Sequence, residues 1–144
     1  MKNTKGSRGF TLMELLVVIG IIAILASAVI VALNPARQFA EARNSQRVAN
    51  VNAILNAIGQ NVAENKGVFI CTAHQIDTAT SSADSIKDCL VPTYMPSLPT
   101  DPLAVSTSSY DVSKDATTGR FTVCAPLAAG ETSVASSTAL CVVR

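Results

Sequence analysis

The chain has 144 residues, of which 49% are hydrophobic and 15% charged, and its formal net charge is +1. This length accommodates one modest domain. No basic patch lies beyond residues 1–9, so the sequence lacks the composition typical of nucleic-acid-binding proteins. The apolar content excludes disorder of the whole chain.

The apolar residues are concentrated in one segment near the amino terminus. From Leu15 to Leu33 every residue is Leu, Val, Ile, Ala, Gly or Ser. A helix of this length spans about 28 Å, close to the hydrocarbon thickness of a bilayer. Residues 1–9 contain three cations and no acid. Because cations that flank a membrane span stay in the cytoplasm, we expect the chain after Leu33 to face outward.

Three interpretations of this amino-terminal segment compete. A secretory signal would be cleaved at the Ala-x-Ala-like site Ala26–Ala28, although apolar residues continue beyond that site. An uncleaved signal anchor would span the membrane. Neither interpretation gives a role to Glu14, the acid that lies at the start of the apolar run.

The third interpretation rests on Gly9-Phe10 and on Glu14, the fifth residue counted from Phe10. With the basic leader and the apolar helix, these residues resemble the prepilin cleavage and N-methylation motif of type IV pilins and type II secretion pseudopilins. The resemblance covers residues 6–33 and implies cleavage between Gly9 and Phe10 by a prepilin peptidase, followed by methylation of the Phe10 amine. We favour this interpretation because it accounts for every feature of the segment.

The carboxylate of Glu14 needs a partner if the segment spans a membrane. An unpaired acid at the centre of a membrane helix costs about 2.5–3.5 kcal/mol on insertion scales. Cleavage after Gly9 would create a cation, the α-amine of Phe10, and a neighbouring copy could bring that amine to Glu14. Glu14 and Phe10 are therefore the predicted assembly residues. The alternative is that Glu14 reaches the headgroups or is protonated.

Asn34-Pro35 follows the apolar run and predicts a kink or a new helix start. From Ala36 to about Asn65 the apolar spacing predicts an amphipathic helix, which Lys66-Gly67 would end. The side chains expected on its buried face are Val48, Val51, Ile54, Leu55, Ile58 and Val62.

The remainder of the chain shows short runs typical of strands. Strands are expected at Ser109–Val112, Arg120–Ala125 and Thr138–Val143, with a turn near Thr118-Gly119. Val68–Ile70 also reads as strand-like, whereas Asp77–Ser85 is expected to be a loop and the proline-rich Tyr94–Pro102 irregular.

The predicted fold class is α+β, with a long helical stalk whose first half spans the membrane and a small antiparallel sheet as the head. The expected segments are a leader at 1–9, a transmembrane and assembly helix at 10–34, an amphipathic helix at 35–66 and a β-rich head at 67–144. The pilin resemblance implies the same architecture.

Four cysteines, Cys71, Cys89, Cys124 and Cys141, lie in the predicted head. An even number of cysteines outside the cytoplasm predicts two disulfides, for which three connectivities exist. We prefer Cys71–Cys89, which closes the Ser/Thr-rich loop, and Cys124–Cys141, which joins two expected strands. The sequence contains no C-x-x-C pair, the motif that would indicate a metal or redox site.

No catalytic motif is recognisable in the sequence. His74 lies three residues after Cys71, but a surface histidine beside a disulfide explains it better than a Cys–His nucleophile. Nucleophile elbows, phosphate loops and paired carboxylates are absent from the sequence, so we do not expect an enzyme.

The loop Leu98–Pro102, followed by Tyr110, resembles the corresponding loop of the major pseudopilins. This resemblance implies calcium near the loop, with Asp101, Asp111 and Asp115 as candidate ligands. Their spacing lacks the closed set of oxygens that calcium requires, which favours a solvated turn capped by Asp101 and no cofactor.

The sequence therefore predicts a structural subunit of a type IV pilus-like filament that serves pilus formation or protein secretion. Its expected partners are copies of itself, the prepilin peptidase and methyltransferase, the assembly platform and membrane lipid, with no nucleic acid. We expect a single-pass membrane protein with a cytoplasmic amino terminus and an extracytoplasmic head, which later joins a cell-surface or periplasmic filament. The alternative is a membrane-anchored binding module that does not polymerise.

Overall fold

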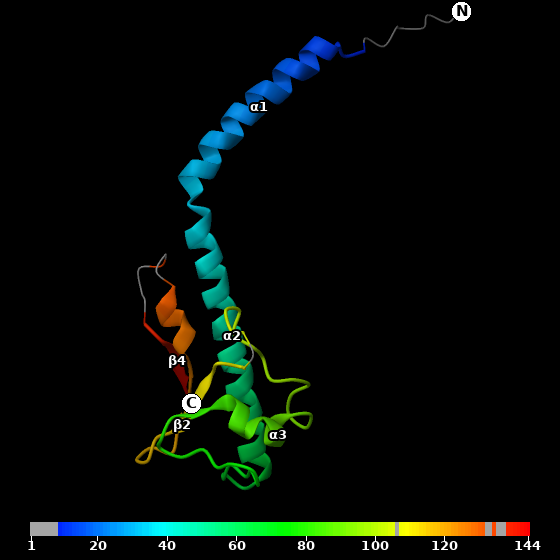
Figure 1. Cartoon of the computed structure of the whole chain (residues 1–144). Coiled ribbons are helices and arrows are strands. Elements are labelled where there is room, and N and C mark those ends of the chain that lie inside the picture. Colours follow the sequence, from blue (N-terminus) through cyan, green and yellow to red (C-terminus); the bar gives the residue numbers. More distant parts are fainter. Residues whose placement is uncertain (1–8, 106, 132–133, 135–137) are drawn as a thin grey trace, which may run out of the picture. The chain divides into compact units, whose positions relative to one another are not determined.

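A computed structural model describes residues 9–105, 107–131, 134 and 138–144 (Figure 1). The chain divides into two compact units, Met1–Gln38 and Phe39–Arg144. Each unit is described separately below.

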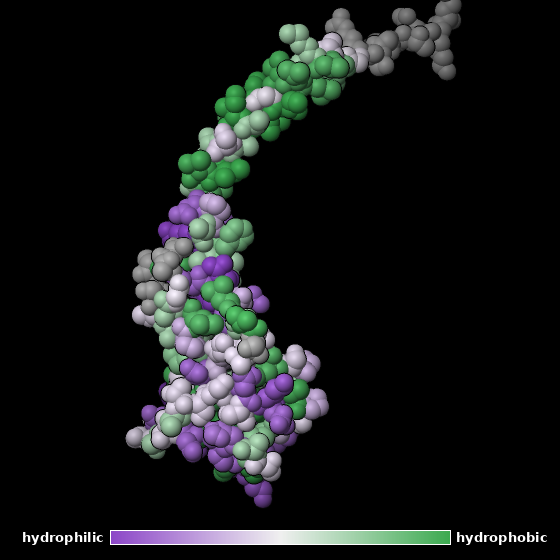
Figure 2. Space-filling view, in the orientation of Figure 1, coloured by the Kyte–Doolittle hydropathy of each residue, from purple (hydrophilic) through white to green (hydrophobic). Residues whose placement is uncertain are grey.

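The first unit consists mainly of helix α1, Leu12–Leu33. None of its described side chains is buried, and hydrophobic side chains cover the face of α1 seen in Figure 2. The helix ends at Asn34, whose φ of 43° lies in the left-handed region. Pro35 then begins α2, and the Asn34 side chain accepts the Arg37 N–H at 3.4 Å. The predicted interruption at Asn34-Pro35 is therefore confirmed as a new helix start.

Helix α2, Pro35–Glu64, supplies the helical side of the core in the second unit. The predicted buried face is wrong at Val48, which is 40% exposed. The helix ends as predicted, because Lys66 and Gly67 have φ values of 56° and 91° and the Gly67 N–H donates to the Val62 carbonyl at 2.8 Å. The buried side chains of α2 are Ala40, Arg47, Val51, Ile54, Leu55, Ala57, Ile58 and Asn61.

The sheet has four antiparallel strands in the order β1-β2-β3-β4. The strands are β1 Ser81–Ser82, β2 Asp111–Lys114, β3 Phe121–Ala125 and β4 Leu140–Val143. The short helical segments η1 Ala83–Ile86 and α3 Lys87–Leu90 follow β1, and η2 Pro126–Gly130 follows β3. The predicted α+β class is therefore confirmed.

The structure corrects several strand predictions. Val68–Ile70 forms no strand, because the Ile70 N–H donates to the Asn61 side chain at 2.9 Å and the Ile70 carbonyl accepts from it at 3.0 Å, so these backbone groups pair with α2. The expected loop Asp77–Ser85 contains β1 and the start of η1. Strand β2 begins at Asp111 instead of Ser109, whose φ of 56° is incompatible with a strand. Tyr94–Pro102 is irregular, as predicted.

One hydrophobic core joins α2 to the sheet and to α3. Ile54 and Ile58 of α2 belong to the same buried cluster as Val112 of β2, Val123 of β3 and Leu90 of α3.

The preferred disulfides Cys71–Cys89 and Cys124–Cys141 are both present in the structure. Cys124 lies directly opposite Cys141 in the β3–β4 register. A disulfide typically adds about 2–4 kcal/mol of stability to a small domain.

Alanine substitutions at two glycines of the second unit are expected to change the free energy of unfolding in opposite directions. Gly59 lies within α2 and an added Cβ would meet no atom within 4 Å, so Gly59→Ala is expected to raise the free energy of unfolding by about 0.4–1 kcal/mol. Gly119 has a φ of +70°, so Gly119→Ala is expected to lower it by about 1–2 kcal/mol. Urea denaturation of the detergent-solubilised chain measures both, and equal shifts would contradict these assignments.

Candidate functional site: the amino-terminal helix and the ion pairs of the head

The start of α1 contains a closed set of hydrogen bonds between Thr11 and Glu14. The Thr11 N–H and the Thr11 hydroxyl each donate to Oε2 of Glu14 at 2.9 Å, and the Glu14 N–H donates to the Thr11 hydroxyl oxygen at 3.2 Å. This is a capping box, which satisfies amide groups that the first turn leaves unpaired. Its signature, a threonine three residues before an acid and an apolar run, was present in the sequence but was missed.

Glu14 and Phe10 both remain accessible beside this cap. Both hydrogen bonds that the carboxylate accepts go to Oε2, so Oε1 of Glu14 has no partner among the described residues. Phe10 is 84% exposed. Together with Met13 and Val17 these residues line a shallow groove of about 510 Å³. The predicted assembly residues Phe10 and Glu14 therefore line the same open surface, and Gly9, the other predicted processing residue, is exposed.

The rest of α1 presents an apolar surface that none of the described residues of its unit covers. Its 22 residues contain an 18-residue window of mean hydropathy 3.2, and by length and composition the helix can cross a membrane. The Ser27 hydroxyl donates to the Ile24 carbonyl at 2.7 Å, so this polar group is satisfied within the helix. An exposed apolar surface of this extent is typical of contact with lipid or with another protein.

The head contains a second polar cluster, centred on the fully buried guanidinium of Arg47. Its Nε and Nη2 donate to the two carboxylate oxygens of Asp101 at 2.7 and 3.0 Å. Its Nη1 donates to Oε1 of Glu131 at 2.9 Å and to the Asn44 side chain at 2.7 Å. The Nε and Nη2 atoms of Arg43 donate to Oε1 and Oε2 of the same Glu131 at 2.7 and 2.6 Å. Two arginines of α2 thus hold two loop carboxylates.

These contacts shift the proton affinities of the groups. Hydrogen bonds from Arg43 and then Arg47, acting against the effect of burial, lower the pKa of Glu131 from 4.5 to about 2. The hydrogen bond to Asp101 is the main cause of the raised pKa of Arg47. A buried ion pair of this kind is worth most as a device that specifies which segments meet. Here it attaches the Asp101 loop and the end of η2 to α2.

Sequence reasoning missed Arg47 because it treated charged positions of the amphipathic helix as solvent-facing. Arg47 nevertheless precedes Val51 by four residues and Ile54 by seven, which is the spacing of the buried face. That periodicity was the available signal, since a charge on a buried helical face requires a buried partner.

The three candidate calcium ligands are not brought together. Asp101 is 2% exposed and is paired with Arg47, so the expected solvated turn is wrong, although Asp101 does accept the Leu103 N–H at 2.9 Å. Asp111 pairs with Cys124 across the sheet, and Asp115 accepts N–H groups within its own turn. Among the described residues no three His, Cys, Asp or Glu side chains form a group that could hold a metal.

The remaining sequence candidate, His74, is exposed, and its Nε2 lies 3.3 Å from the Ser81 hydroxyl oxygen. The sulfur of Cys71 is bonded to Cys89. The pair therefore has no thiol with which to act as a nucleophile.

Comparison with known proteins identifies the amino-terminal part of the site. Residues 4–30 match the family model described as the prokaryotic N-terminal methylation motif. This segment is the prepilin-type signal of type IV pilins and pseudopilins, and the α+β architecture agrees with it. No curated protein and no solved structure matches the chain.

The chain thus carries the signal of a class of structural proteins, and the motif and α1 fit a membrane-anchored, pilin-like protein. The recognised signal does not extend into the head, so the role of the Arg47 cluster follows from its geometry alone.

Glu131 predicts how the stability of the head changes in acid. The pKa of Glu131 is lower in the folded chain than the usual 4.5. The ionised carboxylate therefore contributes fully to the free energy of unfolding above pH 4.5, and this contribution is lost as the pH falls toward 2. Glu131→Gln should lower the urea midpoint at neutral pH and reduce its further fall between these two pH values.

The matched control for this measurement is Asp88→Asn, which removes an exposed acid of α3 whose side chain makes no hydrogen bond or ion pair with the described residues. It should leave the acid dependence of the midpoint unchanged. An unchanged acid dependence in Glu131→Gln would contradict the assignment.

Proposed function

We propose that the chain is the precursor of a structural subunit of a type IV pilus-like filament, either a pilin or a major pseudopilin, that serves pilus formation or type II protein secretion. The observation that carries the proposal is the methylation motif joined to a helix none of whose described side chains is buried. Such a helix requires lipid, other helices, or each in turn.

Processing would take place on the cytoplasmic side of the membrane. The leader contains three cations and no acid, which favours a cytoplasmic amino terminus and an extracytoplasmic head. A prepilin peptidase would cleave between Gly9 and Phe10, and the new amine of Phe10 would be methylated. The partners are then this enzyme, an assembly platform in the membrane and further copies of the chain. The finished filament would lie at the cell surface or in the periplasm.

Assembly would use the pair formed by Glu14 and the Phe10 amine of a neighbouring copy. Oε1 of Glu14 has no partner among the described residues, so it can accept that amine while Oε2 keeps its bonds to Thr11. Phe10 and Glu14 are four residues apart, which corresponds to a stagger of about 6 Å between neighbouring helices. The pair would set the stagger, because its strength in a low dielectric depends on close approach.

Transfer from lipid into a filament would keep the apolar side chains of α1 away from water. Small side chains along α1, among them Gly20, Ala23 and Ala26, allow helices to approach closely. The free energy of hydrophobic burial is therefore largely retained in both surroundings, and packing together with the Glu14 pair would decide between them.

Intact mass and amino-terminal sequencing of the membrane-embedded protein test the proposal directly. We expect a chain that begins at N-methylated Phe10 in cells that contain a prepilin peptidase. A chain that begins at Val29 would identify a secreted protein, and one that begins at Met1 would identify an uncleaved anchor. Either of these results would overturn the proposal.

Replacement of Glu14 separates processing from assembly. Glu14→Ala is expected to leave the mass of the mature chain consistent with cleavage and methylation, while the yield of sheared filaments falls strongly because the Phe10 amine loses its partner. Ser27→Ala, which removes a hydroxyl satisfied within the same helix, is the control and should assemble normally. Normal filament yield from Glu14→Ala would rule out the pairing.

A further inference from the structure

A loop of the head carries two aliphatic side chains into solvent from a firmly held base. The Asp101 N–H donates to the Ser108 carbonyl at 3.0 Å, and the Ala104 N–H donates to the Asp101 carbonyl at 3.0 Å. The Asp101 carboxylate is in turn held by Arg47. Beyond this base Val105 is fully exposed and Leu103 is 50% exposed. We call these two side chains the Leu103–Val105 tip.

Aliphatic side chains that remain in water cost free energy relative to buried ones, because removing apolar surface from water is favourable. The sequence of the segment 102–105 contains no charged residue. The tip could therefore enter an apolar site without the penalty of desolvating a charge.

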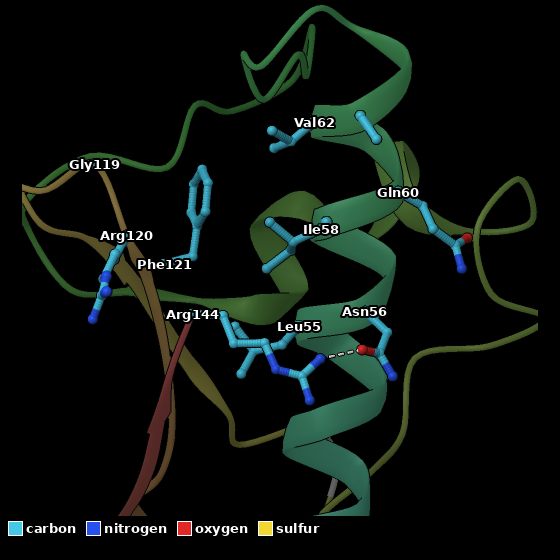
Figure 3. A pocket seen from close by; sticks show the side chains of 11 residues that line it. Leu55, Asn56, Ile58, Gln60, Val62, Gly119, Arg120, Phe121 and Arg144 are labelled. Carbon is cyan, nitrogen blue, oxygen red and sulfur yellow. Dashed lines mark hydrogen bonds between the residues drawn. The ribbon is translucent and has the colours of Figure 1, made fainter.

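The head also contains an apolar groove between α2 and β3, which we call the α2–β3 groove (Figure 3). Leu55, Ile58 and Val62 point from α2 toward Phe121 of β3 across it. The groove has a volume of about 660 Å³. A cavity of about 150 Å³ already accommodates a benzene-sized group, so the groove has room for both side chains of the tip.

Cations border the groove, and charges of both signs lie at the base of the tip. Arg120 and Arg144 line the groove and Lys114 lies 5.6 Å from the Phe121 ring centre, whereas no described lining residue is acidic. At the base of the tip, Asp84 accepts the Ser108 N–H at 3.1 Å, and Lys87 lines the same hollow. Asp84 is therefore the carboxylate that a cation of the groove could approach when the tip docks.

We propose that the Leu103–Val105 tip of one copy docks in the α2–β3 groove of a second copy of this chain. The proposal rests on the proposed function, because that function places many copies side by side and in the same direction in one membrane. It adds a contact between heads to the pairing of Glu14 and Phe10.

The positions of tip and groove along α2 fit a filament. Arg47, which holds the base of the tip, precedes Ile58 of the groove by 11 residues of α2, or about 16 Å along the helix axis. Copies that point in the same direction must therefore be displaced by about 16 Å along the axis for the tip of one to reach the groove of another. This displacement exceeds the stagger of about 6 Å set by the Glu14 pair, so the two contacts would join different pairs of copies. Such a contact is heterologous and propagates as an open helix instead of closing as a dimer.

The test uses the full chain in cells that process it, with a photo-cross-linking amino acid in place of Val105. We expect a cross-linked dimer in which position 105 of one copy is joined to residues 55–63 or 119–121 of the other. The same amino acid in place of Ala79, an exposed residue outside tip and groove, should not give this product. Joining of position 105 to another surface or another protein, or the absence of a dimer, would overturn the proposal.

Two substitutions test the contact from its two sides. Val105→Asp and Ala63→Trp, which fills the groove from its exposed helical edge, should each lower the yield of sheared filaments by about tenfold or more. Ala79→Asp adds the same charge elsewhere and should leave the yield unchanged. The urea midpoint of each variant verifies that the head is folded.

The outcomes separate this proposal from the proposed function. Methylated Phe10 and normal filaments from Val105→Asp would leave the filament function standing and rule out the docking. A cross-linked dimer through the groove, from a chain that is neither cleaved nor assembled, would support the docking and rule out the filament function.

Discussion

The apolar surface of α1, of which no described side chain is buried in its own unit, is the constraint on which the rest of the molecule depends. Hydrophobic surface of that extent requires lipid or other helices. The requirement makes the polar groups at the start of the helix costly, and the capping box of Thr11 and Glu14 reduces this cost within the chain. One carboxylate oxygen nevertheless remains without a partner among the described residues, as the proposed pairing with a neighbouring copy requires.

The second unit needs its own sources of stability, because α1 belongs to the first unit and none of its described side chains is part of the core. Its core is small, since α2 contributes one face and the strands contain at most five residues each. Two disulfides and the ion pairs of Arg47 compensate by joining distant parts of the chain. Because Arg47 holds Asp101, this stabilisation also holds the base from which Leu103 and Val105 are exposed. Arg47 therefore contributes both to the stability of the head and to the position of its exposed loop.

Local chemistry explains which predictions succeeded. The helix start at Pro35 and the stop at Lys66-Gly67 depend on backbone preferences of the residues themselves, and both are confirmed. The run Val68–Ile70 satisfied a strand pattern, but the backbone groups of Ile70 pair with the Asn61 side chain of α2 instead of with a strand. Two-residue β1 exists only because β2 lies beside it, so composition alone could not reveal it.

The sequence by itself determined the membrane-compatible helix, the methylation motif, the helix break and the α+β class, because each is encoded in consecutive residues or in a short period. It also limited the cysteines to three pairings. Only the tertiary structure decided that Arg47 lies inside, that Asp101 is its partner, and that Glu131 joins them from more than eighty residues away. Those contacts depend on the meeting of segments far apart in the chain, and the desolvation that makes a buried charge require partners arises only when the core closes around it.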